Sequence, residues 1–212
     1  MSNVNHFIDL PSLSPDLLKG ILQNAHELKK HKFSPPQIFK GLSLAMVFDK
    51  RSTRTRMSFE IGMKQLGGHT IVMNMSEMQL GGDESAESTA HVLSRYVDGI
   101  MLRMSDQCDM EELAKHSTIP VINGMTNLSH PCQIMADLLT IEEKLGKVEG
   151  KKIAWFGDSN NVSNTFVQAA DIFEFELILA LPEDIHDRAP KGANVTADAA
   201  QAAKDADVLV TD

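Results

Sequence analysis

Apolar residues along this chain alternate between short continuous runs and stripes of helical period. The run at 42–48 has the length of a buried strand, and Phe59, Met63 and Leu66 follow it at i, i+4 and i+7, with Met57 and Ile61 widening the stripe. Further short runs predict strands at 70–73, 98–104, 119–124, 153–156, 177–181 and 208–210. Because strands that alternate with helices form parallel sheets, we expect an α/β fold with helices covering each sheet.

Local signals predict where the helices begin and end. Ser14 followed by Pro15 predicts a helix start, Asp109 predicts the cap of a short helix, and Gly67 predicts the end of the helix after residue 57. The apolar stripe of the segment 131–146 predicts an interdomain helix that Gly146 ends. We therefore expect two domains, 1–146 and 147–212, each with a parallel sheet flanked by helices, the second being Rossmann-like and incomplete.

Four neighbouring residues follow the first predicted strand and carry candidate chemistry. They are Ser52, Thr53, Arg54 and Thr55, which lie at a turn from strand to helix. Unpaired backbone N–H groups and the helix dipole attract an anion at such a turn, and a guanidinium can bind two phosphate oxygens at once. The turn therefore predicts a phosphate site. Two plainer interpretations stay open: Ser52 or Thr53 is only an N-cap, and the basic residues are only a solvated run of charge.

Other polar residues stand at the ends of later strands. Arg103 closes the strand 98–104, His130 precedes the helix 131–146, and Asn161 follows the strand 153–156. Because open parallel sheets bind ligands at the carboxyl ends of their strands, we expect these residues to face one crevice with the turn at 52–55. Arg103 as an edge ion pair and His130 as a simple helix-entry residue are the alternatives.

Composition and charge narrow the partners. The 212 residues carry a formal net charge of −9, which argues against a nucleic-acid or anionic-membrane partner but allows a local basic pocket for a small anion. The sequence has no apolar run of about 20 residues, no secretory leader pattern and no CxxC pair, so we expect a cytoplasmic protein. It also has no HxH, HExxH, GxGxxG or GxxxxGK[ST] motif, so we expect neither a metal nor a cofactor.

Three motifs carry a family resemblance. FDKRSTRTRMSFE at 48–60 resembles the carbamoyl-phosphate motif of the aspartate/ornithine carbamoyltransferase family, and HPCQ at 130–133 resembles the signature of its ornithine branch. GDSNN at 157–161 is similar to a third segment of that branch.

The resemblance implies roles for single residues. Phosphate binding falls to the four residues 52–55, and Thr55, Arg103 and His130 would bind the carbonyl oxygen as the catalytic donors. Gln133 would bind the carbamoyl amino group, and Gln79, in the polar segment 75–87 that we expect to be a lid or an arm, would reach a neighbouring subunit. Asn161 and Asp212 would contact ornithine.

The implied activity is transfer of the carbamoyl group of carbamoyl phosphate to the δ-amine of L-ornithine, giving L-citrulline and phosphate for arginine biosynthesis. A homotrimer is implied as well. Another acceptor amine (putrescine, acetylornithine or aspartate) is an alternative, although Cys132 disfavours aspartate. The chain ends at Asp212, before the family's SMG and HCLP segments, so a catalytically incomplete phosphate-binding fragment is a further alternative.

Overall fold

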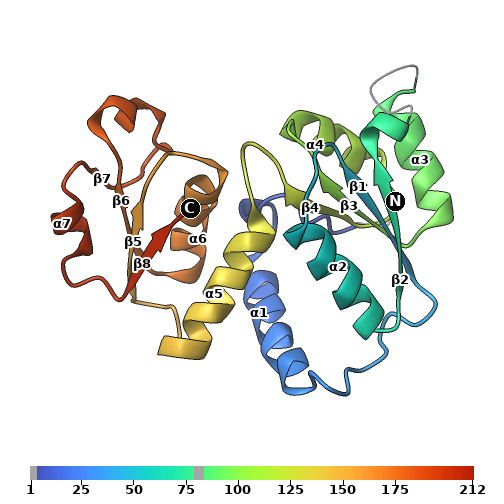
Figure 1. Cartoon of the computed structure of the whole chain (residues 1–212), viewed down its shortest axis with the longest axis horizontal. Coiled ribbons are helices and arrows are strands. Elements are labelled where there is room, and N and C mark those ends of the chain that lie inside the picture. The colour runs from blue at the N-terminus through green and yellow to red at the C-terminus, as the bar shows by residue number, and fades with distance from the viewer. Residues whose placement is uncertain (1–3, 79–83) are drawn as a thin grey trace. The chain divides into compact units, whose positions relative to one another are not determined.

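The computed structural model describes residues 4–78 and 84–212, which form two compact units (Figure 1). The first unit comprises residues 4–8 and Asn24–Asn127, and the second comprises Asp9–Gln23 and Leu128–Asp212. Helix α1 (Pro15–Lys30) contributes residues to both units. Residues 128–146 belong to the second compact unit. Compact units need not coincide with functional domains, so the expected domain boundary near residue 147 stays a prediction.

The first unit is built on a parallel sheet of four strands in the order β2-β1-β3-β4. Its strands are β1 (Ser43–Phe48), β2 (His69–Asn74), β3 (Gly99–Arg103) and β4 (Val121–Met125). Its helices are α2 (Arg54–Gln65), α3 (Ala86–Tyr96) and α4 (Gln107–His116), with a 3-10 turn at Met75–Glu77.

The alternation of side chains along β1 explains how helices cover both faces of this sheet. Ala45 and Val47 pack with buried residues of α3 and α4, whereas Met46 belongs to the opposite cluster, against which Phe59 and Met63 of α2 pack. Because successive side chains of a strand point to opposite faces, one apolar run serves both layers. The expected fold class is confirmed for this unit.

Two local expectations in the first unit are wrong. Met57 and Ile61 were expected to widen the buried stripe of α2, but they are 53% and 44% exposed, because the helix contacts the sheet along a narrower line through Phe59. The cap of α4 is Asp106 and not Asp109: the Asp106 carboxylate accepts the N–H of Cys108 at 2.7 Å, which places Asp109 inside the first turn.

The second unit repeats the arrangement with the strand order β7-β6-β5-β8, all parallel. On one face Trp155 of β5 meets Phe166 of α6, with 6.2 Å between ring centroids, and on the other Ala154 packs with Ala202 of α7. The elements are β5 (Lys152–Phe156), β6 (Glu176–Ala180), β7 (Val195–Thr196), β8 (Val208–Thr211), α5 (Pro131–Leu145), α6 (Asn161–Phe173) and α7 (Ala199–Ala203). Two further 3-10 turns are Leu10–Ser12 and Glu183–Arg188.

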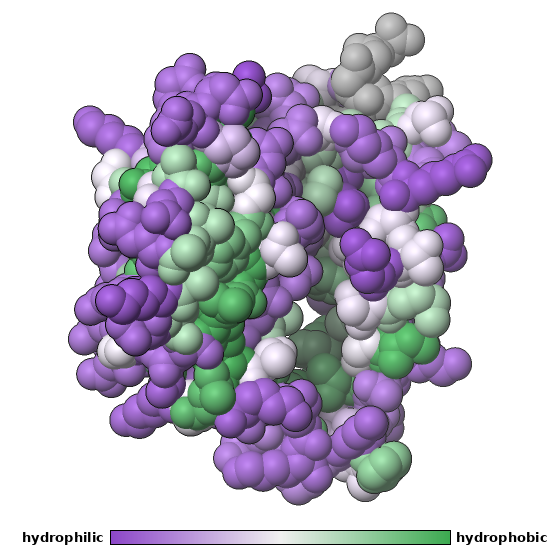
Figure 2. Space-filling view, turned by 60° about the vertical axis from the view of Figure 1, so that its left-hand side comes forward, coloured by the Kyte–Doolittle hydropathy of each residue, from purple (hydrophilic) through white to green (hydrophobic). Residues whose placement is uncertain are grey.

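The surface is mostly hydrophilic on the face seen in Figure 2, where apolar residues gather in a band. One large exposed apolar side chain of the second unit is Leu209 (62% exposed), on the edge strand β8. Among the helices of the described residues, none combines the length and apolar character that crossing a bilayer requires.

Candidate active site

The turn between β1 and α2 presents open backbone donors. Thr53 occupies the N-cap position, but its backbone is already helical (φ −84°, ψ −53°) and its side chain makes no capping hydrogen bond. The first N–H groups of α2 therefore have no side-chain acceptor from this residue, and the helix dipole adds to the positive potential there. Thr53 is therefore the N-cap by position, but its hydroxyl does not act as a cap.

The basic residues of the turn differ in their surroundings. Arg56 forms an ion pair with Glu60 one turn later, with 3.3 Å between Nε and Oε2, as expected of a solvated helix face. Arg54 is exposed at the first position of α2 and has no ion-pair partner in the described part of the chain. The charge-run interpretation therefore fits Arg56, whereas Arg54 stays available to an anion.

Arg103 reaches the same turn from the neighbouring strand. It pairs in register with Phe48, and its Nη1 donates a hydrogen bond of 2.8 Å to Oγ1 of Thr55. Burial lowers the pKa of the guanidinium, the carboxylate of Asp49 opposes this shift, and the charge of Arg54 adds to it. No ion pair of Arg103 lies within residues 4–78 and 84–212, so the edge ion pair considered above does not form there.

Asp49 is a structural residue of this site that the sequence analysis missed. Its Oδ2 accepts hydrogen bonds from the backbone N–H of Ser105 at 2.6 Å and from the Ser105 hydroxyl at 2.7 Å. Its own N–H donates to the carbonyl of Arg103 at 3.0 Å. Asp49 therefore ties the loop after β1 to the loop after β3. The one available signal was its position as the first polar residue past a buried strand.

A β-bulge next to Arg103 adjusts the direction of that strand. Leu102 pairs with Asn123 but Arg103 pairs with Met125, so β4 holds one extra residue, Gly124. A Cβ at Gly124 would lie 2.5 Å from Sδ of the buried Met101 and 3.1 Å from the carbonyl of Leu102. Glycine is the residue that permits this close approach.

His130 and Gln133 lie at the start of α5 in the second unit. His130 occupies the N-cap position before Pro131, and its N–H donates to Oγ1 of Thr165 at 2.9 Å. The amide of Gln133 donates to Oδ1 of Asp137 at 2.9 Å. Burial raises the pKa of Asp137 to about 6, the Gln133 hydrogen bond opposes this, and the charge of Asp212 adds to it.

Asn161 and Asp212 follow two neighbouring strands of the second sheet. Asn161 is the first residue of α6, which Asn160 caps through a reciprocal capping box with Ser163. The amide of Asn160, one position before Asn161, donates to Oδ2 of Asp212 at 3.1 Å. The structure thus brings Asp212 to the start of α6. Cys132 is half-buried, and desolvation of its thiol raises its pKa to about 12, which is typical of an unreactive cysteine.

The predicted residues therefore fall into two local groups. The residues 52–55 and Arg103 come together in the first unit, and the start of α5, the start of α6 and Asp212 belong to the second. Gln79 lies outside the described residues.

Comparison with known proteins shows one consistent family. The family model for the carbamoyl-phosphate-binding domain of aspartate/ornithine carbamoyltransferases matches residues 5–143. A relative from Caulobacter vibrioides named ornithine carbamoyltransferase is 46% identical over 228 aligned positions, which cover 100% of this chain and 73% of the relative.

Solved structures agree with this. The chain is similar to the ornithine carbamoyltransferase of Burkholderia thailandensis, with a TM-score of 0.91 at 38% identity over 98% of this chain and 75% of the other. It is also similar to that of Pyrococcus furiosus, with a TM-score of 0.89 at 39% identity over 98% and 71%. This chain therefore spans about three quarters of the length of these proteins.

Proposed function

The chain belongs to the aspartate/ornithine carbamoyltransferase family, and on this premise we propose that it transfers the carbamoyl group of carbamoyl phosphate to the δ-amine of L-ornithine. The products are L-citrulline and phosphate, as a step of arginine biosynthesis. The observation that carries the proposal is the hydrogen bond from Arg103 to Thr55 at the open start of α2. It places a cation and a hydroxyl from two elements beside unoccupied helix N–H groups.

The leaving phosphate would bind at the turn between β1 and α2. The backbone N–H groups of the first turn would donate hydrogen bonds to its oxygens, as would the hydroxyls of Ser52, Thr53 and Thr55, and Arg54 would add a planar pair of donors. Because this binding strengthens as the bridging oxygen gains charge, it would favour departure of the phosphate as well as its capture.

The carbonyl oxygen of the carbamoyl group would gain negative charge when the neutral amine attacks the carbon. Arg103 is half-buried and directed at Thr55, so the hydroxyl of Thr55 accepts from Arg103 and keeps its own proton for a ligand oxygen. A donor of this oxyanion-hole type is commonly worth about 3 to 4 kcal/mol. The substrate amine is the nucleophile, so the protein supplies donors and positioning.

The roles that the sequence motifs assign to the second unit belong to the same proposal. His130 would donate to the carbonyl oxygen, and the side-chain carbonyl oxygen of Gln133 would accept from the carbamoyl amino group. Asn161 and Asp212 would hold ornithine, and the contact of Asp212 with Asn160, next in sequence to Asn161, supports a shared task for these two strand ends. Each of these four roles can be tested by a single substitution.

Assembly and location are part of the proposal. We expect a homotrimer in which Gln79 reaches the carbamoyl phosphate of a neighbouring subunit, and a cytoplasmic location. Sedimentation of the purified protein, with and without carbamoyl phosphate, measures its oligomeric state. A Gln79→Ala substitution measures the contribution of that side chain to the affinity for carbamoyl phosphate.

The decisive experiment is a citrulline assay on the gene product with a panel of amines. We expect product from L-ornithine and at least a hundredfold less carbamoylated product from putrescine, acetylornithine or aspartate, because an acceptor that leaves buried polar groups of the site unpaired is strongly disfavoured. Carbamoyl-phosphate binding without turnover of any amine would support the phosphate-binding fragment instead. Preference for another amine would keep the family and change the substrate.

A further inference from the structure

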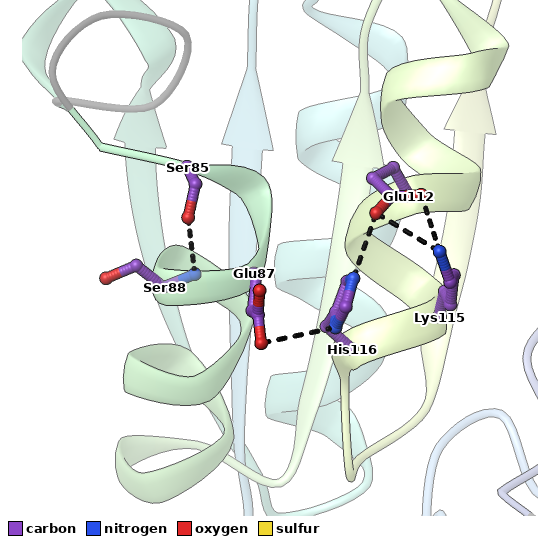
Figure 3. Close-up of polar contacts among 6 residues, drawn as sticks. All are labelled: Ser85, Glu87, Ser88, Glu112, Lys115 and His116. Atoms are coloured by element: carbon purple, nitrogen blue, oxygen red, sulfur yellow. Dashed lines mark hydrogen bonds and ion pairs between the residues drawn. The ribbon is translucent and has the colours of Figure 1, made fainter.

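Helices α3 and α4, which pack against each other on one face of the first sheet, each carry a glutamate and a histidine one turn apart. Glu87 and His91 have this spacing on α3, and Glu112 and His116 have it on α4. Because residues four apart lie on the same side of a helix, each pair presents two potential metal ligands together. Figure 3 shows His116 between the two carboxylates, with Glu87 on the α3 side.

The hydrogen bond of His116 determines which of its ring nitrogens faces the other helix. Nε2 lies 2.9 Å from Oε1 of Glu112, and Nδ1 lies 3.9 Å from Oε1 of Glu87. An N–H at Nε2, donated to Glu112, leaves the lone pair of Nδ1 directed toward Glu87. The separation of 3.9 Å is longer than a hydrogen bond and close to the distance between two ligand atoms of one metal ion.

His91 completes the group. One ligand atom each from Glu87, His91 and His116 lies within 4.8 Å of the others, and the two imidazole rings meet edge to face at 6.2 Å between centroids. The group stays accessible from solution, because Glu87 and His91 are exposed and the His116 side chain retains 22% of its exposure. Within residues 4–78 and 84–212 no other set of three such side chains is this close.

We propose that Glu87, His91 and His116 form a binding site for a zinc ion, with Glu112 as the positioning residue for His116. Two imidazole nitrogens and one carboxylate oxygen are a donor set that suits Zn²⁺, whereas Mg²⁺ and Ca²⁺ prefer oxygen ligands alone. A carboxylate that accepts the second N–H of a metal-bound histidine is the usual outer partner of such a site. Water would fill the fourth position.

The charges around the site are compatible with a divalent cation. Glu112 also accepts a hydrogen bond from Lys115 at 3.3 Å, and its bonds to His116 and Lys115 lower the pKa of its carboxyl group. Both contacts therefore favour the ionised form of the Glu112 carboxyl group. A zinc ion would join α3 to α4 with ligands from both helices.

This site shares no residue with the proposed carbamoyl-phosphate site, so its test does not depend on catalysis. Zn²⁺ is titrated calorimetrically into metal-free protein at about pH 7.5. We expect one Zn²⁺ per chain with a dissociation constant in the micromolar range and no measurable binding of Mg²⁺. Absence of Zn²⁺ binding up to millimolar concentration overturns the proposal.

Substitutions locate the binding. His91→Ala lies on an exposed helix position, so we expect it to fold and to weaken Zn²⁺ binding at least a hundredfold. Glu87→Gln removes a ligand charge without changing shape and should weaken binding as well. His31→Ala, an exposed histidine beyond α1, is the matched control and should bind like the parent protein. Unchanged affinity in His91→Ala, or lost affinity in His31→Ala, places the zinc elsewhere and overturns the proposal.

The outer residue and a spectroscopic probe give two more readouts. Glu112→Gln should weaken Zn²⁺ binding by about 10-fold to 100-fold, as is usual when an outer partner is removed, and an unchanged constant refutes its positioning role. Co²⁺ should give the absorption bands of a tetrahedral site in the parent protein and lose them in His91→Ala.

Discussion

Arg103 at the end of β3 donates a hydrogen bond of 2.8 Å to the hydroxyl of Thr55 on the first turn of α2. Since the oxygen of Thr55 accepts this bond, the Thr55 proton is free to point toward a ligand. The same bond holds a half-buried guanidinium at the place where the N–H groups of α2 are open. Two donors from different elements are thereby fixed before any substrate arrives, which is the condition for electrostatic stabilisation of a growing charge.

Thr55→Val should lower kcat by about 100-fold to 1,000-fold, because it removes one pre-placed donor and the acceptor that orients Arg103 while keeping a β-branched side chain. The initial rate of citrulline formation at saturating carbamoyl phosphate measures it. Thr118→Val, at an exposed loop position, is the control and should have the parent rate. A change of less than threefold in Thr55→Val would contradict the donor role.

Arg54→Ala should weaken carbamoyl-phosphate binding by two or more orders of magnitude, because it removes a charged, bidentate donor to the phosphate. Arg56→Ala removes the same kind of side chain two residues later but only breaks a surface ion pair with Glu60, so its affinity should change less than threefold. Isothermal titration with carbamoyl phosphate, and with inorganic phosphate as a stable probe, compares the two variants. Equal losses in both would mean that only the net charge of the turn matters.

Asp49→Asn should lower kcat about tenfold or more while leaving the fold intact, because one charge-assisted acceptor for the loop after β3 is lost and Arg103 is held less firmly. The carboxylate also favours the charged guanidinium of Arg103. The pH dependence of the rate separates this role from a purely structural one: the variant should lose activity at lower alkaline pH than the parent. Asp49→Glu should restore part of the activity.

Asp137→Asn should stabilise the second unit at neutral and alkaline pH. The folded-state pKa of Asp137 is raised to about 6, so folding favours the protonated carboxyl group. Below the ordinary pKa of 3.8 the group is protonated in both states and does not lower the free energy of unfolding. As the pH rises from there to about 6, ionisation of Asp137 lowers the free energy of unfolding by an increasing amount. After allowance for partial solvent screening, the expected gain is about 1 to 2 kcal/mol at high pH. Urea unfolding near pH 4 and pH 8 should show the gain only at the higher pH. A gain independent of pH would rule out this origin.

The elements themselves could be predicted from the sequence because their signals are local. The apolar run at 42–48 and the stripe through Phe59 and Met63 identify β1 and α2, and Gly146, with φ +77°, ends α5 where expected. Where the local signals are weaker, the sequence was less informative. Asp106 and Asp109 are equally plausible caps by residue type, and strand β7, which was not predicted, has only two residues.

The parts of the site that the sequence did not reveal depend on contacts between distant segments. Asp49 meets Ser105 across 56 positions, and nothing in either neighbourhood indicates that pairing. Likewise, the group of Glu87, His91 and His116 corresponds to no local sequence motif, because its members come from two different helices. The phosphate turn was predictable for the opposite reason, since its hydroxyls and Arg54 are consecutive and follow a strand end directly.

The bulge at Gly124 makes the geometry of Arg103 depend on how many residues its neighbouring strand contains. Deleting Gly124 would return β4 to step with β3, and the side chains after it would exchange faces of the sheet. Thr126, whose buried hydroxyl donates to Oε1 of Gln107 at 2.9 Å, would lose that partner. A larger residue at Gly124 would instead push against Sδ of Met101, so we expect either change at this position to move the end of β4 away from Arg103.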